Sequence, residues 1–255
     1  MTEVKQKQGI VVSLADVPIR IISDYDDLFS EFLHEFLTDQ KVTYTLEIRK
    51  EDVDHERMMN TGKRATENSL AILALYRKTA ELLIQENILL IHASAISYEN
   101  DGILFLAKSG TGKSTHTQNW MKLFPDKVTV VNGDKPLVKI TGQGANVYGT
   151  PWSGKEKWYS NTSVKIKAVC AIVRDRQNYT EEVSSGDFFP YLIQQTYVSK
   201  DQNRYQKELD LLSKLSSMVN FYKIHCNMEI ESAEKAWSAI YDNEFIYYKM
   251  TDGEA

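Results

Sequence analysis

Residues 103–114 read Ile-Leu-Phe-Leu-Ala-Lys-Ser-Gly-Thr-Gly-Lys-Ser, and this stretch decides the fold. Its apolar run, 103–107, predicts a buried strand, and the polar segment that follows, 115–123, predicts a helix. The loop between them fits the phosphate-binding pattern Gly-x-x-x-x-Gly-Lys-Ser, with Ala107 in place of the first glycine. In such a loop, successive backbone N–H groups point at phosphate oxygens, and the helix adds its positive N-terminal end. The stretch therefore predicts a nucleotide-phosphate site between a strand and a helix.

Two side chains of this pattern are expected to act directly on the phosphates. The Lys113 ammonium would bridge the β- and γ-phosphates of ATP, and the Ser114 hydroxyl would ligate Mg²⁺. The other residues of the loop are expected to contribute mainly backbone N–H groups. The expected nucleotide-binding residues of this stretch are Ser109, Gly110, Thr111, Gly112, Lys113, Ser114 and Thr115.

Two further side chains are expected at the same edge of the sheet. The neighbouring strand, predicted at residues 128–131, leads into Asn-Gly-Asp, and Asp134 would ligate Mg²⁺ or accept the proton of an attacking hydroxyl. The alternative is an aspartate that serves only the turn. His92 ends the strand before the phosphate-loop strand, and it would donate to phosphate or pair with Asp134. A purely structural histidine is the alternative at that position.

A loop predicted at residues 149–158 contains glycines, lysines and tryptophans. Lys155 would add a mobile cation at the phosphates, and Glu156 would add an acid at the metal or at the acceptor. Trp152 and Trp158 would wall the pocket. The alternative is an exposed loop whose tryptophans are buried for packing.

The rest of the chain is predicted to form two parts. Residues 1–61 read as strand, acidic amphipathic helix and strand, which is a small α+β unit. Residues 62–255 would form the nucleotide-binding domain, because strand, glycine loop, helix, strand and acid follow in the order of an α/β core. The polar stretch 51–62 lacks apolar periodicity and is predicted to be a loop. His116, on the helix after the phosphate loop, is predicted to lie at the surface.

The composition is that of an ordinary globular protein. The 255 residues are 42% hydrophobic and 25% charged, and the formal net charge is -5. This negative balance offers no basic field for nucleic acid. No apolar leader follows Met1 and no apolar run reaches the roughly 18 residues of a membrane helix, so we expect no membrane partner and a cytoplasmic location. The two cysteines, Cys170 and Cys226, are expected to be unpaired core residues.

The run Leu-Ile-His-Ala-Ser-Ala at residues 90–95, the glycine loop and the acid after the next strand together resemble the catalytic domain of HPr kinase/phosphorylase and its phosphoenolpyruvate-carboxykinase-like relatives. The resemblance spans residues 70–240 and implies a P-loop kinase core. It also implies that His92 lies near the transferred phosphate and that Asp134 acts as base or metal ligand. Gly133 stands where those kinases carry the first of two adjacent acids, and the chain lacks the length that builds the oxaloacetate site of the carboxykinases. The chain most resembles short, divergent HPr-kinase-like proteins, some of which phosphorylate serine in ribosomally made peptides.

We therefore expect an enzyme, an ATP-dependent and Mg²⁺-requiring kinase that transfers the γ-phosphoryl group to a hydroxyl. The favoured acceptor is a serine of a ribosomally made peptide or of a protein. Lys113 and Mg²⁺ would hold the phosphates while Asp134 accepts the hydroxyl proton. The alternatives are a small-molecule kinase on the same scaffold and an accessory protein that binds ATP without transferring its phosphate. The sequence names neither the acceptor nor the oligomeric state.

Overall fold

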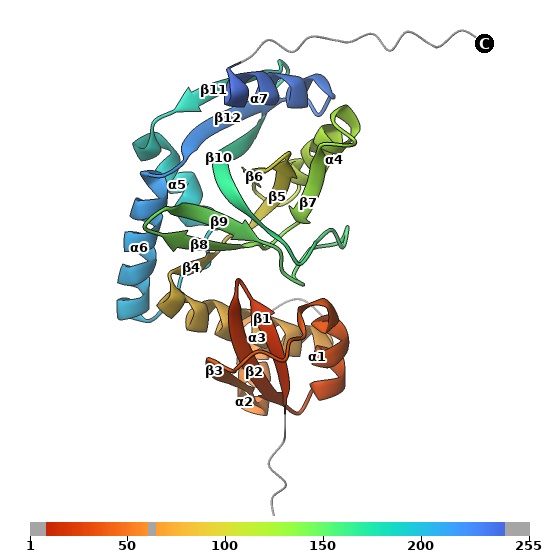
Figure 1. The fold of residues 1–255 in the computed structure, drawn as a ribbon, viewed down its shortest axis with the longest axis vertical. Helices are drawn as coiled ribbons and strands as arrows, with labels where there is room; N and C mark the ends of the chain where they lie inside the picture. The colour runs from red at the N-terminus through yellow and green to blue at the C-terminus, as the bar shows by residue number, and fades with distance from the viewer. Residues whose placement is uncertain (1–8, 61–64, 243–255) are drawn as a thin grey trace, which may run out of the picture.

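The computed structural model describes residues 9–60 and 65–242, which form a mixed α/β fold built on two sheets (Figure 1). A three-stranded sheet lies in the N-terminal part, and a nine-stranded sheet with helices on both faces forms the larger part. Within the described ranges, no helix has the length and apolar character needed to span a bilayer. The elements in chain order are β1 (Ile10–Leu14), β2 (Val17–Ser23), α1 (Asp26–Phe32), η1 (His34–Phe36), β3 (Tyr44–Ile48), α2 (Lys50–Met59), α3 (Glu67–Leu83), η2 (Ile84–Glu86), β4 (Ile88–Leu90), β5 (Ala93–Tyr98), β6 (Asp101–Leu106), α4 (Lys113–Leu123), β7 (Val128–Asn132), β8 (Leu137–Thr141), β9 (Gly144–Tyr148), β10 (Ser163–Arg174), β11 (Tyr179–Val183), α5 (Ser185–Gln195), α6 (Gln202–Ser216), β12 (Asn220–Cys226) and α7 (Glu231–Tyr241).

The N-terminal sheet contains a strand that the sequence analysis did not predict. β2 pairs antiparallel with β1 and parallel with β3. The turn from β1 to β2 consists of Ala15 and Asp16, both at positive φ (50° and 62°). This left-handed turn matches the twist of a hairpin, but its usual sequence signal is Asn-Gly or Asp-Gly. Because that signal is absent, the hairpin could not be recognised from the sequence.

Helix α2 occupies most of the stretch that was predicted to be a loop. Its polar residues face α3, where Asp52 binds Lys78 at 2.9 Å and Glu56 binds Arg77 at 2.6 Å. Because ion pairs to a second helix stabilise α2, the prediction from missing apolar periodicity was wrong here. The end of the predicted loop lies outside the described residues.

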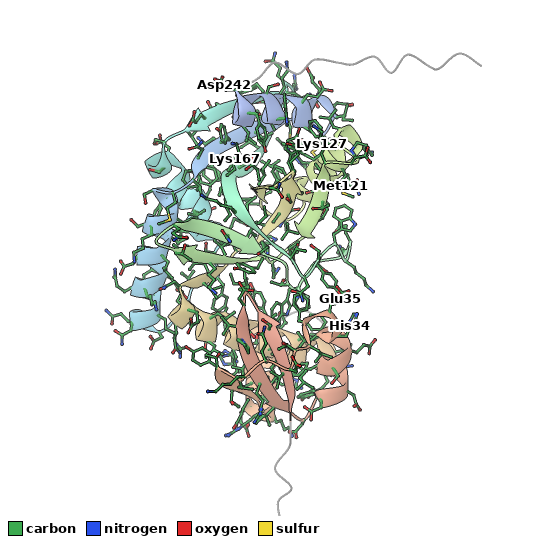
Figure 2. All side chains as sticks on the ribbon, viewed as in Figure 1. His34, Glu35, Met121, Lys127, Lys167 and Asp242 are labelled. Carbon is green, nitrogen blue, oxygen red and sulfur yellow. The ribbon has the colours of Figure 1, made fainter. Side chains whose placement is uncertain are left out.

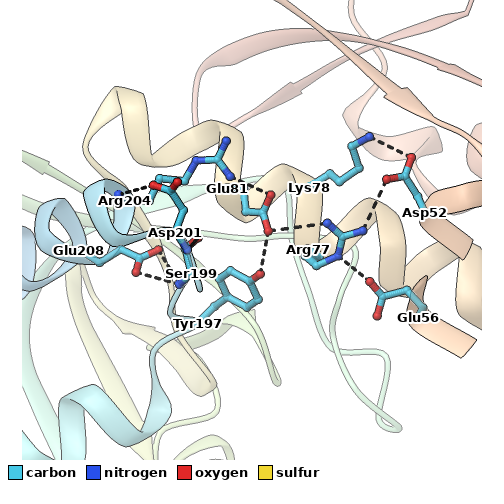
Figure 3. A network of polar contacts seen from close by, with 10 residues as sticks. All are labelled: Asp52, Glu56, Arg77, Lys78, Glu81, Tyr197, Ser199, Asp201, Arg204 and Glu208. Atoms are coloured by element: carbon cyan, nitrogen blue, oxygen red, sulfur yellow. Dashed lines mark hydrogen bonds and ion pairs between the residues drawn. The ribbon is translucent and has the colours of Figure 1, made fainter. Parts of the chain in front are cut away.

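Helix α3 connects the N-terminal sheet with the larger sheet. Its apolar face is buried in one cluster together with β1, β2, β3 and β4. Toward α6, Glu81 of α3 accepts hydrogen bonds from Arg204 at 2.9 Å and from the Tyr197 hydroxyl at 3.1 Å (Figure 3). Helix α3, which follows residue 61, therefore packs on the N-terminal sheet and also binds the chain before and within α6, and the division of domains at residue 61 stays a prediction.

The order and direction of the strands in the larger sheet bring the ends of three strands together along one side of the sheet. The strand order is β4-β8-β9-β10-β6-β5-β7. In addition, β12 pairs with β10, and β11 pairs with β12. β5 and β6 form a hairpin in which Tyr98 pairs with Asp101, so the turn between them is short. β5 is also antiparallel to β7. The C-terminal ends of β6 and β7 and the N-terminal end of β5 therefore lie at the same edge of the sheet.

The apolar run of β6 is explained by burial on both faces. Ile103 and Phe105 pack in one cluster with residues of α4 and α7. Leu104 and Leu106 point to the other side and pack in a second cluster with residues of α5 and α6. Alternate side chains of β6 therefore pack on two different layers of helices. The loop after β6 consequently begins between these two layers.

His116 of α4 is buried at 1% exposure, so its predicted surface position was wrong. Its Nε2 accepts a hydrogen bond from Trp120 Nε1 at 3.1 Å, and its Nδ1 lies 3.2 Å from the Ser232 hydroxyl of α7. Helix α7 covers this face of α4, and burial lowers the pKa of His116 to about 3. His116 is therefore a neutral packing residue. The prediction for Cys170 and Cys226 is confirmed, since both are buried and unpaired.

Candidate active site

The glycine-rich segment forms a tight turn between β6 and α4. Gly110 and Gly112 have φ values of 77° and 125°, conformations that residues with side chains rarely adopt. A Cβ atom at Gly112 would also overlap the side chain of Met228. Residues 113–115 form the first turn of α4, whose N–H groups have no carbonyl partners within the helix. The predicted phosphate ligands therefore lie on one continuous loop and helix start.

Arg174, at the end of β10, holds this loop from one side. Its Nε donates to the carbonyl oxygen of Thr111 at 3.1 Å, and its Nη2 donates to the carbonyl oxygen of Gly110. The guanidinium fixes the loop through its carbonyls and adds a permanent positive charge beside it. The sequence analysis gave Arg174 no role, because no local pattern reveals that β10 ends beside the loop.

Three nitrogen-bearing side chains converge on the carboxylate of Asp134. His92 Nε2 lies 3.0 Å and Lys113 Nζ lies 3.5 Å from Asp134 Oδ1. Lys135 Nζ lies 2.7 Å from Asp134 Oδ2. The structure thus brings together His92, Lys113 and Asp134, which were selected from three separate segments. Lys135 completes the cluster. It follows Asp134 directly in the sequence, and that adjacency is a signal that the sequence analysis left unused.

The way in which the strands carry these residues differs from the prediction. The strand that leads to Asp134 is not the neighbour of the phosphate-loop strand, because β5 lies between β6 and β7. Asp134 nevertheless lies beside Lys113, because β6 and β7 end at the same edge. β5 begins at that edge, and His92 directly precedes it. The start of β5 therefore places His92 between Lys113 and Asp134.

The turn that presents Asp134 is built around Asn132, which is fully buried at 0% exposure. Asn132 Oδ1 accepts the backbone N–H groups of Asp134 at 2.9 Å and of Lys135 at 2.7 Å. Its Nδ2 donates to the carbonyl oxygen of Thr150 at 2.9 Å. One amide therefore fixes the backbone of the turn and attaches the loop after β9 to it.

Gly133 has no room for a side chain. A Cβ atom there would lie 2.8 Å from the carbonyl oxygen of Ser153, and the Gly133 N–H donates to the carbonyl oxygen of Trp158 at 2.8 Å. The close approach of the loop therefore excludes any side chain, and so any further carboxylate, at position 133. The cluster has Asp134 as its single carboxylate at this turn.

His92 is held from both sides. Its Nδ1 lies 2.8 Å from Gln195 Oε1 at the end of α5, and its backbone N–H donates to the Gln195 carbonyl oxygen at 2.6 Å. With Nδ1 held against Gln195 Oε1, Nε2 lies against Asp134 Oδ1, so both ring nitrogens face acceptor oxygens. A ring nitrogen whose partner is fixed in this way has a defined orientation. Gln195 was not predicted, and its sequence neighbourhood gives no signal for it.

The cluster combines two ammonium groups with the Asp134 carboxylate, and the Glu156 carboxylate acts on Lys113 from nearby. Burial lowers the pKa of Lys113 to about 8, although the Asp134 charge opposes this shift. Burial raises the pKa of Asp134, but the hydrogen bonds from His92 and Lys135 and the charges of both lysines outweigh it, so the net shift is downward. At neutral pH an ionised carboxylate therefore faces the ammonium groups of Lys113 and Lys135. Both ammonium groups can also meet an anion that binds at the start of α4.

The loop after β9 is attached to the N-terminal unit. Trp152 is 7% exposed, and its ring centroid lies 6.1 Å from that of Phe32 and 5.7 Å from that of Tyr76. Asn161 Nδ2 donates at 2.8 Å to the carbonyl oxygen of Glu35, which Figure 2 labels on the side of the N-terminal unit that faces this loop. Trp152 is thus buried for packing, the alternative stated above, and it does not wall an open pocket.

The tip of the same loop lies against the Asp134 turn. A Cβ atom on Gly154 would lie 3.0 Å from Asp134 Cβ. Glu156 is close enough for its charge to act on Lys113. Lys155 is exposed, and within the described ranges it forms no hydrogen bond or ion pair with Lys113 or Asp134. The structure therefore places the loop at the cluster without bringing Lys155 into it.

A metal ion would depend on ligands from outside the protein. Among the described residues, no group of three or more His, Cys, Asp or Glu side chains is arranged to hold a metal. Mg²⁺ suits this situation, because it usually keeps several waters and takes one or two carboxylates together with substrate phosphates. The Asp134 carboxylate and the Ser114 hydroxyl fit that donor set. They would hold Mg²⁺ only together with a bound polyphosphate.

Comparisons with known proteins give a likeness to solved structures that is distant. No protein-family model matches the chain, and no curated protein matches it. Among solved structures, the Hpr(Ser) kinase/phosphatase from Coxiella burnetii aligns with a TM-score of 0.34 and 11% sequence identity. The alignment covers 60% of this chain and 97% of that one. This likeness in fold assigns no activity, acceptor or cofactor to the chain.

Proposed function

We propose that the protein is an ATP-dependent, Mg²⁺-requiring phosphotransferase that transfers the γ-phosphoryl group to a hydroxyl, a serine of a peptide or protein. The observation that carries this proposal is the cluster at the start of α4. There Lys113, which directly follows the glycine loop, contacts an aspartate that His92 and Lys135 also hold. A phosphate site, an acid and a histidine at one point are the parts that phosphoryl transfer to a hydroxyl requires.

The donor would bind with its phosphates along the loop and the first turn of α4. The N–H groups of this turn and the positive helix end favour an anion there. Lys113 would bridge the β- and γ-phosphates, and Ser114 and Asp134 would hold Mg²⁺ between protein and phosphates. When bound, Mg²⁺ supplies neutralisation of the charge on the β- and γ-phosphate oxygens.

Binding of phosphate would change the partners of Asp134. Lys113 Nζ contacts Asp134 Oδ1 at 3.5 Å, and the same ammonium is the group expected at the phosphates. When it turns to the phosphates, Asp134 gives up this contact and keeps His92 and Lys135 as its partners. Its Oδ1 atom is then freed from one partner when the donor is present.

In the transfer step, the acceptor oxygen forms a bond with the γ-phosphorus while the bond from that phosphorus to the ADP oxygen breaks. The acceptor proton passes to Asp134, and ADP leaves with the electron pair of the broken bond. His92 keeps the carboxylate oriented through the contact of its Nε2 with Oδ1. Lys135, 2.7 Å from the other carboxylate oxygen, balances charge at the turn. The protein supplies alignment and charge rather than covalent chemistry.

Two alternatives are distinguished by the fate of the phosphate. A small-molecule kinase would use the same cluster with a different acceptor. An accessory nucleotide-binding protein has no need for an acid held by three partners, so the geometry around Asp134 favours an enzyme. The peptide or protein serine rests on the sequence resemblance described above.

The test is transfer of label from γ-labelled ATP, starting with peptides encoded beside the gene and followed by small hydroxyl compounds. We expect label in a serine of a peptide for the wild type and for Asp126→Asn, an exposed aspartate on the connection after α4. Asp134→Asn should lose the transfer. Label in a small compound would indicate a small-molecule kinase instead of a peptide or protein kinase. Release of inorganic phosphate alone would indicate an ATPase.

A further inference from the structure

A cavity of about 260 Å³ lies directly beside the glycine loop. Its apolar wall consists of Leu106 and Ala107, at the end of β6, and Ile172 and Val173, at the end of β10. Tyr191 of α5 adds an aromatic ring to the lining. Gln195, the partner of His92, also lines the cavity, but His92, Lys113, Asp134 and Lys135 do not, so its occupant is a separate question.

The boundary between cavity and loop is cationic. Lys108 and Arg174 both line the cavity, and Arg174 also donates to the loop carbonyls of Gly110 and Thr111. An apolar space that opens past two cations toward a phosphate loop suits a ligand with a flat, weakly polar part and an anionic part. A nucleotide has this construction.

The direction of the bound donor follows from the strand order. β5 and β10 pair with opposite edges of β6. His92 precedes β5 and contacts Asp134, so the reacting end of a triphosphate lies on the β5 side of the loop. The other end of the donor is then directed toward β10, where the cavity lies. An acceptor, by contrast, must approach the γ-phosphate from the Asp134 side.

We propose that this cavity binds the base and ribose of the donor nucleotide, with Tyr191 beside the base. The proposal rests on the proposed function, because it takes the phosphate end of the donor to lie at Lys113. The cavity is smaller than the roughly 300 to 1,000 Å³ of pockets for whole drug-sized ligands, which fits one part of a nucleotide whose phosphates lie outside it.

The Tyr191 ring is already held in position by its neighbours. Its ring centroid lies 5.6 Å from that of Phe188, and Lys223 Nζ lies 5.7 Å from its centre. These neighbours hold the ring, yet the residue is 37% exposed. An aromatic side chain that is already fixed loses little conformational entropy when a base stacks on it.

The experiment compares MgATP with magnesium tripolyphosphate, which has the phosphates but no nucleoside. Dissociation constants are measured by calorimetry for the wild type, Tyr191→Ala and Val173→Phe, with thermal unfolding as the check on folding. Tyr205→Ala on α6 is the matched control, because Tyr205 is 41% exposed and lies outside the cavity lining.

The wild type should bind MgATP at least about tenfold more tightly than magnesium tripolyphosphate, the size of one base–aromatic contact. Tyr191→Ala and Val173→Phe should weaken MgATP about tenfold and leave tripolyphosphate within about twofold. Equal wild-type affinities for both ligands would overturn the proposal. So would variants that bind MgATP as the wild type does, or that lose both ligands equally. If the folded wild type binds neither ligand, the proposed function itself fails, and that result is distinct from the others.

Discussion

The glycine loop and the Asp134 turn meet at one edge of the sheet, but they are built in opposite ways. The loop is exposed from Lys108 to Gly110, and its shape comes from glycines at positive φ. The turn is fixed by the fully buried Asn132, which binds two backbone N–H groups and the following loop. The loop therefore depends mainly on its own glycines, with Arg174 holding it from one side, whereas the turn depends on a buried network of tertiary contacts. Substitutions in the two regions should have different consequences.

The largest effect on binding should come from the loop side. Lys113→Ala removes the ammonium expected at the β- and γ-phosphates, so the rise in melting temperature caused by MgATP should disappear. Phosphoryl transfer should fall about a thousandfold, as for loss of a strong charge-stabilising donor. Lys122→Ala, an exposed lysine in the last turn of the same helix, is the control and should keep both properties. A full thermal shift in Lys113→Ala would place the phosphates elsewhere.

The turn side should affect chemistry more than binding. Asp134→Asn should lower phosphoryl transfer about a hundredfold while nucleotide affinity stays within about tenfold, because the carboxylate acts on the acceptor proton. Single-turnover transfer and calorimetric binding separate the two effects. If the variant transfers phosphate at the wild-type rate, Asp134 is a turn residue and another base is required.

The buried amide of the turn should contribute mainly to stability. Asn132→Ala leaves the N–H groups of Asp134 and Lys135 without their acceptor, so unfolding free energy in urea should fall by about 2 to 4 kcal/mol. Asn203→Ala, an exposed residue of α6, should change it by less than about 0.5 kcal/mol. Equal stability of the two variants would mean that the Asn132 amide does not hold the turn.

Binding should also depend on pH through Lys113. The free protein holds this lysine with a pKa of about 8, while a bound phosphate favours the charged form. Above that pH the amine must take up a proton before it binds, so MgATP affinity should fall about tenfold between pH 7 and pH 9. Lys113→Arg keeps its charge over this range and should remove the dependence. Calorimetry in buffers of different ionisation enthalpy measures the proton uptake directly.

The smallest effect should come from Gln195, which acts through His92. Gln195→Leu keeps the approximate volume but removes the amide that fixes His92 Nδ1. We expect kcat to fall about fivefold with little change in the KM for ATP, because the imidazole loses the partner that orients it. A change in KM alone would indicate that Gln195 serves only as a wall of the neighbouring cavity.

The sequence predicted the local parts of this molecule well. The strand and helix around the glycine loop are confirmed as β6 and α4, and the mixed α/β class is confirmed. These predictions succeeded because apolar runs and glycine spacing are properties of neighbouring residues. The meeting of His92, Lys113 and Asp134 was expected in outline, although the strand between them was not.

The parts that depend on distant segments were not predictable. Gln195 reaches His92 across 103 residues of chain, and Arg174 reaches Gly110 across 64. Helix α2 is held by ion pairs to α3, which no periodicity within its own sequence reveals. His116 was misplaced for the same reason, since the helix that covers it comes from the end of the described chain. In each case the missing information was the identity of the packing partner.

The β5–β6 hairpin has a consequence for the order in which the site assembles during folding. His92 and the glycine loop flank the two open ends of one hairpin, in which Ala93 pairs with Leu106. Hairpins close on the microsecond scale, and contacts between residues near in sequence form faster than distant ones. The histidine and the phosphate loop can thus approach each other early, before β7 adds Asp134 and before α5 adds Gln195. The lysine side of the site is therefore expected to assemble before its acid.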